Sequence, residues 1–347
     1  MMGTMHLAAL FGTRFPIVQA PMAGVQGSAL AIAVGRAGAL GSLPAAMLAP
    51  DALAAELSAL RESGVPYNVN FFTHTPPQPD AAREAGWRQA LAPFHAEYGV
   101  DPDVIPSGPG RLPFSAATAD LIADFEPPVV SFHFGLPAPH LLDRIRAWRP
   151  VVMSSATTVA EAVWLAERGV DVVIAQGVEA GGHRGHFLTG NRDLTGQRPT
   201  LQLVAAIVDA VARPVLAAGG IADAQGVRAA LAAGAAGVQV GSAFLCADEA
   251  TTSPLRRTAL QAGGETALTT IFTGRPARGL ANRAMREITV QPPAFPLAGA
   301  AMGPLRTAAE ARGSTDFTPL WLGEGAYPQA APAASIVADL ADGLGAE

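Results

Sequence analysis

The chain has 347 residues, half of them hydrophobic, and a formal net charge of −6 at pH 7. This length permits one large core in a single elaborated domain, and the acidic balance predicts no nucleic-acid-binding surface. All 23 basic residues are Arg, so no side chain can form a lysine Schiff base, which excludes PLP enzymes and lysine aldolases.

Compartment and membrane association are constrained by three further features of the sequence. Cys246 is the only cysteine, so we expect neither an intramolecular disulfide nor a thiolate zinc cluster. Residues 1–15 lack the long apolar segment of a signal peptide. The uncharged run 229–247 is interrupted by glycine and polar residues, which favours a helix end and a buried strand over a membrane span. We expect a cytoplasmic protein without membrane contact, and the sequence does not define its oligomeric state.

Eight short apolar runs alternate with predicted helices along the chain. One helix is expected from Thr200 to just before Pro214, and another from Asp223, a good N-cap, to Gly234. Uninterrupted apolar runs suit strands buried on both faces, and their alternation with helices favours a (β/α)8 TIM-type barrel in the α/β class. The predicted strands lie near residues 16–20, 39–43, 67–71, 128–133, 150–154, 170–176, 214–219 and 236–241.

Two segments do not fit a plain barrel. Residues 72–127 follow the third strand, contain many Pro and Gly, and include one short helix near 80–98, so they are expected to form a lid-like insertion. Residues 245–347 are expected to be a C-terminal extension with one clear helix, capped by Ser253 with Pro254 at its first position. Its Pro/Ala-rich stretch 328–335 is expected to be loosely held. We interpret residues 1–347 as one domain.

Polar and glycine-rich features follow six of the predicted strands. In barrels of this type the active site lies at the C-terminal ends of the strands. Each feature alone is ordinary turn chemistry, but six at one rim predict a binding site there. The six features are Gln19 to Met22, Asn68 to Phe72, Ser131 to Gly135, Gln176 to His183, Gly219-Gly220 and Gly241-Ser242.

The features after the seventh and eighth strands predict a phosphate site. Gly219-Gly220 and Gly241-Ser242 stand where backbone N–H groups of such barrels face an anion, and glycine permits close approach. The amides of Asn70 and Gln176 offer both a donor and an acceptor, which suits the edge of a flavin ring.

Two histidines are the candidates for chemistry. His183 lies between Gly181-Gly182 and Gly185, in a loop that can bring an imidazole over a bound ring, where it is suited to proton transfer or anion stabilisation. His133 ends a predicted barrel strand, which is a costly place for a residue without a role. His186 is interpreted as a neighbour without a role. No set of side chains has metal-ligand spacing, so we expect no metal.

Five stretches of the sequence, read together, resemble the class I nitronate monooxygenases. The resemblance extends from Phe15 to about Arg286, and the stretch with His183 is the most specific of the five. The combination of that stretch with His133 indicates class I among related flavin barrels. The five stretches are Gln19 to Met22, Asn68 to Phe72, Ser131 to Gly135, Ala175 to Gly185 and Phe272 to Gly279.

The resemblance implies a TIM-type barrel that holds one non-covalent FMN. It implies that His183 is the catalytic histidine and that His133 belongs to the substrate pocket. The implied reaction is the oxidation of an alkyl nitronate, such as propionate 3-nitronate, by O2 to a carbonyl compound and nitrite. The implied FMN contacts are Met22, Asn70, Gln176, Gly181, Gly182, Gly219, Gly220, Gln239, Val240, Gly241 and Ser242.

The sequence leaves three alternatives open. The first is an NAD(P)H-dependent quinone or enoyl reductase on the same FMN barrel, because fold does not decide chemistry. The second is a phosphosugar isomerase or lyase without flavin, and the third is a ligand-binding barrel without catalysis. The stretch 99–115 contains no Tyr beyond the preceding Tyr98, so the substrate pocket is expected to differ from that of relatives that line it with tyrosines.

Overall fold

The structure, a computed structural model, describes residues 2–345 except 102, 104, 107–110 and 191. Within these residues eight parallel strands form one sheet in the order β1-β9-β8-β6-β5-β4-β3-β2. The sheet closes into a barrel because Gln19 N donates to Leu40 O, and Leu40 N donates to Ile17 O, both at 2.9 Å. All eight predicted strands are confirmed. They are β1 Ile17–Gln19, β2 Gly41–Pro44, β3 Tyr67–Phe72, β4 Val129–His133, β5 Val151–Ala156, β6 Val172–Gln176, β8 Val215–Ala218 and β9 Gly237–Val240.

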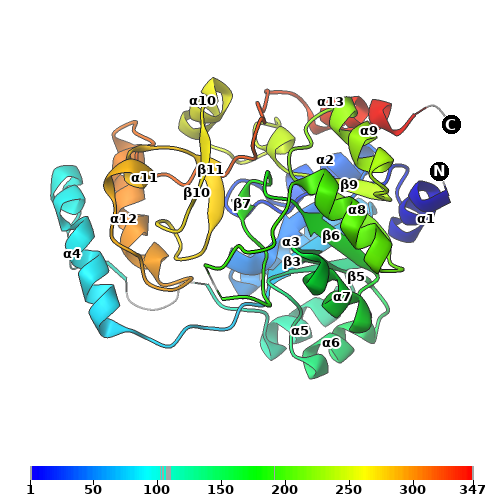
Figure 1. The fold of residues 1–347 in the computed structure, drawn as a ribbon, viewed down its shortest axis with the longest axis horizontal. Coiled ribbons are helices and arrows are strands. Elements are labelled where there is room, and N and C mark those ends of the chain that lie inside the picture. The colour runs from blue at the N-terminus through cyan, green and yellow to red at the C-terminus, as the bar shows by residue number, and fades with distance from the viewer. Residues whose placement is uncertain (1, 102, 104, 107–110, 191, 346–347) are drawn as a thin grey trace.

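Helices surround the barrel, and the last of them comes from the end of the chain (Figure 1). α13 packs against α2 and α9 and therefore completes the helical ring. The expectation that residues 328–335 are loosely held is wrong, because Ala331 forms a β-bridge with Ala247, and Ala333 is fully buried. The surrounding helices are α2 Ser28–Arg36, α3 Pro50–Ser63, α5 Ala116–Ala123, α6 Pro139–Arg146, α7 Val159–Glu167, α8 Thr200–Ala210, α9 Ala224–Ala232 and α13 Ala333–Ala341.

The N-terminal helix α1 (Met2–Phe11) covers one end of the barrel. Its Leu7 and Phe11 pack among Val18, Leu40 and Val172, which lie in or beside the barrel strands. These side chains are buried, so this end is an apolar plug. The opposite end, where the strands finish, is left to form the site.

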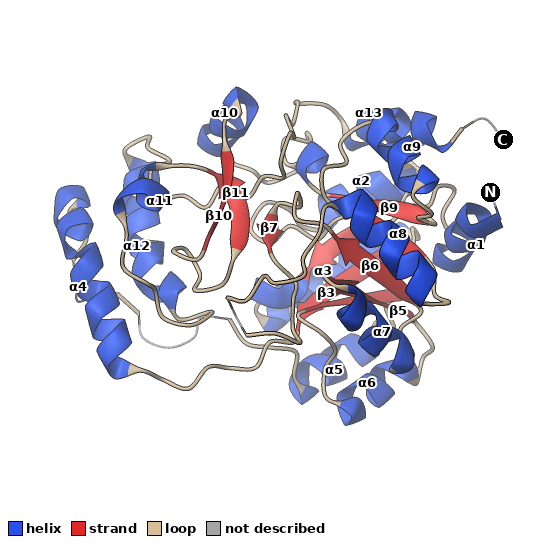
Figure 2. Cartoon of the chain, in the orientation of Figure 1, coloured by secondary structure: helices blue, strands red, loops and turns tan. Residues whose placement is uncertain are grey.

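A second body of structure lies beside the barrel, here called the cap lobe and defined as the described residues of 73–113 together with residues 266–322 (Figures 1 and 2). The helix expected near 80–98 is present, and so is α10 (Pro254–Ala262) after Ser253. The expectation of one clear helix in the extension is wrong, because four helices and two strands occur there. The elements of the cap lobe are α4 Ala81–Tyr98, β10 Thr266–Thr269, β11 Ala277–Leu280, α11 Arg283–Glu287 and α12 Ala298–Ala311. Short 3-10 turns lie at η1 Ala45–Met47, η3 Ser242–Phe244 and η4 Asp342–Leu344.

The cap lobe joins the insertion after β3 to the C-terminal extension. Trp87 and Leu91 of α4 are buried against Leu305 of α12 and Phe317. The indole N–H of Trp87 donates to Ala298 O at 3.2 Å. The two segments stand some 200 residues apart, so their burial in one core fixes the insertion in place instead of leaving it a free flap.

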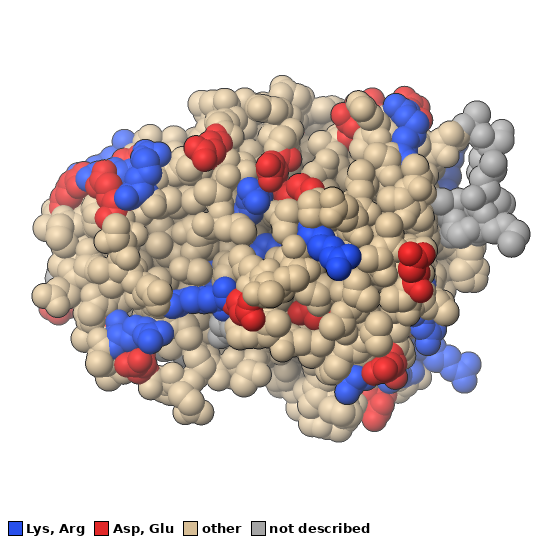
Figure 3. Space-filling model, viewed as in Figure 1, with Lys and Arg blue, Asp and Glu red and all other residues tan. Residues whose placement is uncertain are grey.

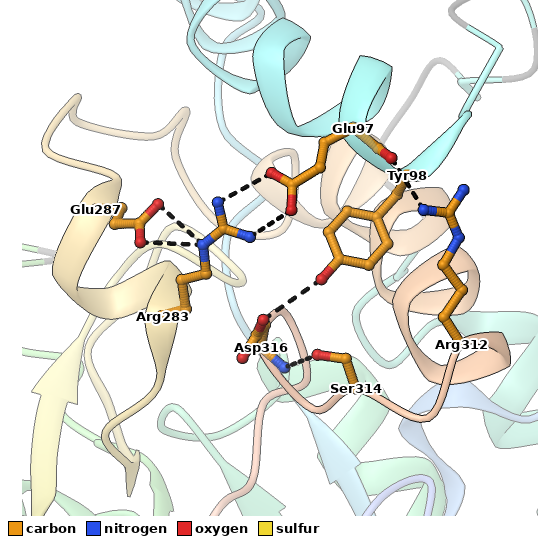
Figure 4. Close-up of polar contacts among 7 residues, drawn as sticks. All are labelled: Glu97, Tyr98, Arg283, Glu287, Arg312, Ser314 and Asp316. Carbon is orange, nitrogen blue, oxygen red and sulfur yellow. Dashed lines mark hydrogen bonds and ion pairs between the residues drawn. The ribbon is translucent and has the colours of Figure 1, made fainter.

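Polar contacts at the surface join α4 to the C-terminal extension (Figure 4). Arg283 donates to both carboxylate oxygens of Glu97 at 2.6 and 2.9 Å, and also to Glu287 at 3.0 Å. The Tyr98 hydroxyl donates to Asp316 at 3.3 Å. The carboxylates of Glu97 and Glu287 are exposed, so their ion pairs with Arg283 orient α4 against α11 and contribute little stability.

Charged side chains are scattered over the molecular face in Figure 3 and form no single large patch. Among the described residues, no helix is long and apolar enough to cross a membrane.

Candidate active site

A cavity of about 360 Å³ opens at the C-terminal ends of the barrel strands and is bounded on one side by the cap lobe. Twelve of the predicted site residues line it. Val240 does not, because its side chain is buried in the barrel wall and its carbonyl accepts a hydrogen bond from Ala20 N at 2.8 Å. The twelve are Met22, Asn70, His133, Gln176, Gly181, Gly182, His183, Gly219, Gly220, Gln239, Gly241 and Ser242.

Glycines shape the barrel side of this cavity. Gly219 and Gly220 have φ values of +121° and +66°, which favour glycine. A Cβ on Gly219 would lie 2.8 Å from Ala180 N. A Cβ on Gly181 would lie 2.6 Å from Gly323 N. The backbone segments that contain these glycines therefore approach their neighbours more closely than a side chain would allow. Their surfaces that face the cavity carry no side chain and are open to a ligand.

Unused donors lie along the same wall. The backbone N–H groups of Gly220 and Gly241 make no hydrogen bond among the described residues. The hydroxyl oxygen of Ser242 accepts from Gly323 N at 2.9 Å, which leaves its hydrogen available to a ligand. These groups can hold an anion between the ends of β8 and β9.

The nearby N-terminus of α8 is already occupied by a carboxylate. Glu179 Oε2 accepts from Thr200 N at 2.9 Å and from the Thr200 hydroxyl at 2.7 Å. A carboxylate at this position satisfies the first-turn N–H groups and the helix dipole. A bound anion is therefore directed to the glycines after β8 and β9 and not to α8.

The amides predicted to face a ring divide into two kinds. Gln176 is hydrogen-bonded by the protein through both amide atoms, because its Nε2 donates to His183 O at 2.9 Å and its Oε1 accepts from Gly185 N at 2.8 Å, which leaves one N–H of Nε2 for a ligand. Asn70 Nδ2 donates to the Ser131 hydroxyl at 2.9 Å. Gln239 Oε1, in contrast, is buried without a partner. An unpaired buried oxygen costs free energy unless a ligand donor satisfies it. We therefore expect Gln239 Oε1 to accept a hydrogen bond from a bound ligand.

His133 is held in one tautomer by its neighbours. Its Nε2 donates to His183 O at 3.2 Å, so its Nδ1 accepts from the Ser155 hydroxyl at 2.6 Å. Burial, reinforced by the charge of Arg275, lowers the pKa of His133 to about 3. A Cβ on Gly185 would lie 2.7 Å from this ring. His133 is therefore a neutral, fixed group at pH 7.

His183 stands at the junction of the barrel and the cap lobe. Its backbone belongs to β7 (Gly182–His183), which pairs with β11, and Ala277 is its register partner. Its Nε2 lies 2.9 Å from the Thr273 hydroxyl. The rings of Phe295 and Trp321 lie 5.4 and 5.5 Å from it.

The surroundings of His183 favour its neutral form. Burial, then the charges of Arg111, His133, Arg275 and His74, lowers the pKa of His183 well below its usual value. Among the described residues its Nδ1 has no hydrogen-bond partner. Nδ1 is therefore the ring nitrogen left for a ligand in the cavity.

Sequence reasoning did not identify two buried charged residues behind the His183 loop. The guanidinium of Arg275 lies 4.1 Å from the ring centre of Phe134, whose φ is +74°, and donates to His186 O. The buried carboxylate of Glu161 accepts from Phe187 N at 2.6 Å. These contacts fix the loop from outside the cavity. Arg275 stands in the family-like stretch 272–279, but its long-range contacts leave no local signal.

Three arginines, and no Asp or Glu, are the charged residues of the described chain that line the cavity. They are Arg111, Arg256 and Arg306. Within the described ranges no group of three or more His, Cys, Asp or Glu side chains is arranged to hold a metal ion. The cavity therefore has a net positive lining and suits an anionic ligand.

Comparison with known proteins places the chain among nitronate monooxygenases. The family model "Nitronate monooxygenase" matches residues 4–343. The chain is 40% identical to a nitronate monooxygenase of Pseudomonas aeruginosa over 362 residues, which cover 98% of this chain and 99% of the relative. It is 38% identical to one from Paraburkholderia phytofirmans, covering 97% and 94%.

Solved structures agree with the fold. A nitroalkane oxidase from Streptomyces ansochromogenes is similar with a TM-score of 0.88 and 38% identity, covering 97% of each chain. FabK from Thermotoga maritima is similar with a TM-score of 0.71 and 24% identity, covering 97% of this chain and 95% of that one, which shows the fold alone.

Proposed function

The chain belongs to the nitronate monooxygenase family, and on that premise we propose that it uses FMN to oxidise alkyl nitronates with O2 to a carbonyl compound and nitrite. The conversion balances when two nitronates and one O2 give two carbonyl compounds and two nitrites. The observation that carries the proposal is one cavity in which free backbone donors, an unpaired Gln239 oxygen and a neutral His183 share the same space.

The cavity has the donors and acceptors that FMN requires. Its one phosphate suits the N–H groups of Gly220 and Gly241 and the Ser242 hydroxyl. A ring N–H of the flavin would satisfy Gln239 Oε1, which lacks a protein donor. When bound, FMN would supply the oxidoreductase chemistry, the transfer of electrons from the nitronate to O2.

His183 is the residue we assign to the reacting group of the substrate. When its Nε2–H donates to Thr273, the Thr273 hydroxyl donates onward to Arg275 O at 3.3 Å, and Nδ1 presents a lone pair that can remove a proton from a nitroalkane. When Thr273 donates to Nε2 instead, Nδ1 carries the hydrogen and can donate to a nitronate oxygen. One hydroxyl therefore supports both tautomers.

The remaining polar residues position His183. Gln176 and His133 both donate to the His183 carbonyl, at 2.9 and 3.2 Å. We assign His133 to substrate binding because it also lines the cavity and has a fixed tautomer. Phe72 and Trp321 line the cavity and lie 6.3 and 5.5 Å from the His183 ring, so they are apolar neighbours for the alkyl chain of a nitronate.

The test is a pair of anaerobic mixing experiments on the flavin-loaded protein. Propionate 3-nitronate should bleach the flavin absorbance rapidly, and NADH should not. In air, the nitronate should then drive O2 consumption and nitrite release without any added nicotinamide nucleotide. Rapid bleaching by NADH, turnover on quinones or enoyl substrates, and no response to nitronates would replace this proposal with the reductase alternative.

A further inference from the structure

A buried arginine, Arg275, stands behind the loop that carries His183 and is not among the residues that line the cavity. Its Nη2 donates to His186 O, and its Nε donates to Arg184 O at 3.4 Å. Both carbonyls belong to the segment that directly follows His183. The guanidinium therefore holds that segment from the side remote from the cavity.

The buried carboxylate of Glu161, on α7, holds the next part of the same loop. Its Oε1 accepts from Phe187 N at 2.6 Å and from Leu188 N at 3.3 Å. Its Oε2 accepts from Thr157 N at 2.7 Å and from the Thr157 hydroxyl at 2.8 Å. Burial lowers the pKa of Arg275 to about 10, and the charge of Glu161 opposes that shift. Arg275 is therefore a cation at neutral pH, and Glu161 is the carboxylate that faces it.

The ring of Phe134 contacts this cation and neighbours three histidines. The guanidinium carbon lies 4.1 Å from the ring centre, which is the geometry of a cation–π contact. The ring centres of His133, His183 and His74 lie 4.5, 6.2 and 6.3 Å from that of Phe134. Phe134 has a φ of +74°, which a bulky residue rarely adopts, so its surroundings hold it in place. One buried positive charge therefore neighbours three imidazoles where it is weakly screened.

The charge of Arg275 acts on all three imidazole rings. Burial, and then this charge, lowers the pKa of His133 to about 3 and that of His74 to about 4. Burial, then the charges of Arg111, His133 and Arg275, lowers the pKa of His183. Each positive charge disfavours a second one nearby, so the three rings are kept neutral. The other charged or titratable groups that act on them are Arg184, for His133, and His186, also for His133.

The backbone of Arg275 acts on the same histidine as its side chain. The Thr273 hydroxyl donates to Arg275 O at 3.3 Å and lies 2.9 Å from His183 Nε2. While Thr273 donates to this carbonyl, it accepts from Nε2, so Nδ1 is the ring nitrogen without a hydrogen. One residue therefore contributes to both the tautomer and the charge of His183.

We propose that Arg275 is a positioning residue for His183, which holds the His183 loop through two backbone carbonyls and keeps the imidazole uncharged. This inference rests on the proposed function, in which His183 meets the reacting group of the substrate. The two parts of the role are separable by substitution. A lysine keeps the charge but lacks the planar fork that spans two carbonyls, whereas a glutamine removes the charge.

The first test does not depend on turnover. The protein, labelled with 15N-histidine, is titrated by NMR between about pH 4 and pH 8, with signals assigned from His→Asn variants. In Arg275→Gln the midpoints of His74, His133 and His183 should rise by about one pH unit. In Arg275→Lys they should stay near the wild-type values. Arg278→Gln is the matched control, because Arg278 lies on the same strand and donates to Val178 O at 2.9 Å. It should leave all three midpoints unchanged.

The second test measures the rate of flavin reduction by a saturating nitronate across the same pH range. Both Arg275→Gln and Arg275→Lys should lower this rate by about ten- to a hundredfold, because the His183 loop loses its fork of hydrogen bonds. KM should stay nearly constant. The pH midpoint of the rate should rise only in Arg275→Gln, together with the histidine midpoints. A loss of packing alone would lower the rate without this difference between the two variants.

Arg275→Gln leaves the buried Glu161 without its cation, which is costly. If that variant does not fold, the double variant Glu161→Gln/Arg275→Gln removes both charges and should show the same rise of the histidine midpoints. Unchanged midpoints on loss of the Arg275 charge, or an equal rise in Arg278→Gln, would overturn the proposal. A wild-type rate of flavin reduction in Arg275→Gln would overturn it as well. If nitronates do not reduce the wild-type flavin, the proposed function fails, and the NMR titration still decides whether Arg275 keeps the histidines neutral.

Discussion

The barrel and the cap lobe both line the cavity, but with different kinds of groups. The barrel contributes glycine backbone, neutral amides and His133, each held by strand ends or by hydrogen bonds to neighbouring loops. The cap lobe contributes Arg111, Arg306 and Trp321, whose positions depend on packing between distant segments. The groups that we propose for cofactor binding therefore lie on the barrel scaffold, whereas the side chains from the cap lobe stand on the part that long-range contacts assemble.

The largest expected effect concerns the predicted phosphate site on the barrel side of the cavity. Gly220→Asp places a carboxylate beside the predicted phosphate site, so the protein should fold but purify without flavin. Gly64→Asp is the control for backbone strain, because Gly64 has a φ of +70° against +66° for Gly220. A Cβ on Gly220 would in addition lie 3.3 Å from Glu179 Cβ, whereas no atom lies within 4 Å of a Cβ on Gly64. Both variants carry the same backbone strain, about 1–2 kcal/mol. The visible spectrum and circular dichroism measure flavin content and folding.

A second variant at the same position separates charge from strain. Gly220→Ala has the unfavourable φ but no carboxylate, so it should retain more flavin than Gly220→Asp. Normal flavin content in Gly220→Asp would show that the phosphate does not bind at the end of β8.

The next effect concerns the junction where His183 meets Thr273. His183→Asn should lower the rate of flavin reduction at saturating nitronate by roughly ten- to a hundredfold, because a hydrogen bond to a charged group is lost. His133→Asn should chiefly raise KM, since we assign His133 to the substrate pocket and not to proton transfer. The exposed His140, changed to Asn, controls for histidine loss in general. Rapid-mixing and steady-state kinetics separate the two parameters. Similar small changes in both parameters for both variants would remove this division of roles.

The barrel was predictable because its signals are local. Each strand is a short apolar run, and helix caps such as Asp223 and Ser253 stand beside the helices they begin. The C-terminal rim follows from the rule that active sites of such barrels lie at strand ends. The cap lobe could not be predicted in the same way, because Trp87 and Leu305 meet only after the chain has returned across the barrel.

The residues of the candidate site also differ in whether a local sequence signal marks them. His183 stood out between glycines, and Gly219-Gly220 stood at the end of a strand. The hydrogen bonds of Gln176 depend on the path of the His183 loop, so sequence could not show that its amide is used internally while Gln239 is the one left unpaired. Arg111 and Arg306 carried no signal, because a lone arginine in a loop or on a helix looks like a surface residue.

A smaller expected effect concerns His74, which is buried where the barrel meets the cap lobe. His74 is buried, and the rings of Phe134 and Phe295 lie 6.3 and 4.8 Å from its ring. Burial, then the charges of Arg275 and Arg111, lowers the pKa of His74 to about 4.

The sign of the pH effect follows from that shift. In the unfolded chain His74 takes up a proton below about pH 6.5, whereas in the folded chain it does so only near pH 4. Its neutral state therefore stabilises the fold fully above pH 6.5, and the benefit is lost as the pH falls towards 4. At pH 5 the loss is about 2 kcal/mol. His74→Phe should reduce the decrease in thermal stability between pH 7 and pH 5 by about this amount. The same decrease in wild type and variant would show that His74 is not the acid-sensitive group of this contact.

The smallest expected effect concerns two neighbouring serines on one strand of the barrel. Ser155 and Ser154 are neighbours on β5, and both are buried. The Ser155 hydroxyl donates to His133 Nδ1 at 2.6 Å, whereas the Ser154 hydroxyl donates to Gly135 O at 2.9 Å. Each alanine variant loses one buried hydroxyl donor, which for Ser154 also lies 3.3 Å from Phe132 O, so each should cost about 1 kcal/mol of folding stability.

Only one of the two variants should alter the substrate pocket. Without Ser155 the Nδ1 of His133 has no donor, and the ring is free to change tautomer and release the His183 carbonyl. Ser155→Ala should therefore raise KM for nitronates by about fivefold, with kcat nearly constant, and Ser154→Ala should leave both unchanged. Steady-state kinetics on the two variants, matched for flavin content, make the comparison. If Ser154→Ala raises KM as much as Ser155→Ala does, general loosening of β5 accounts for the effect, and His133 does not depend on its tautomer.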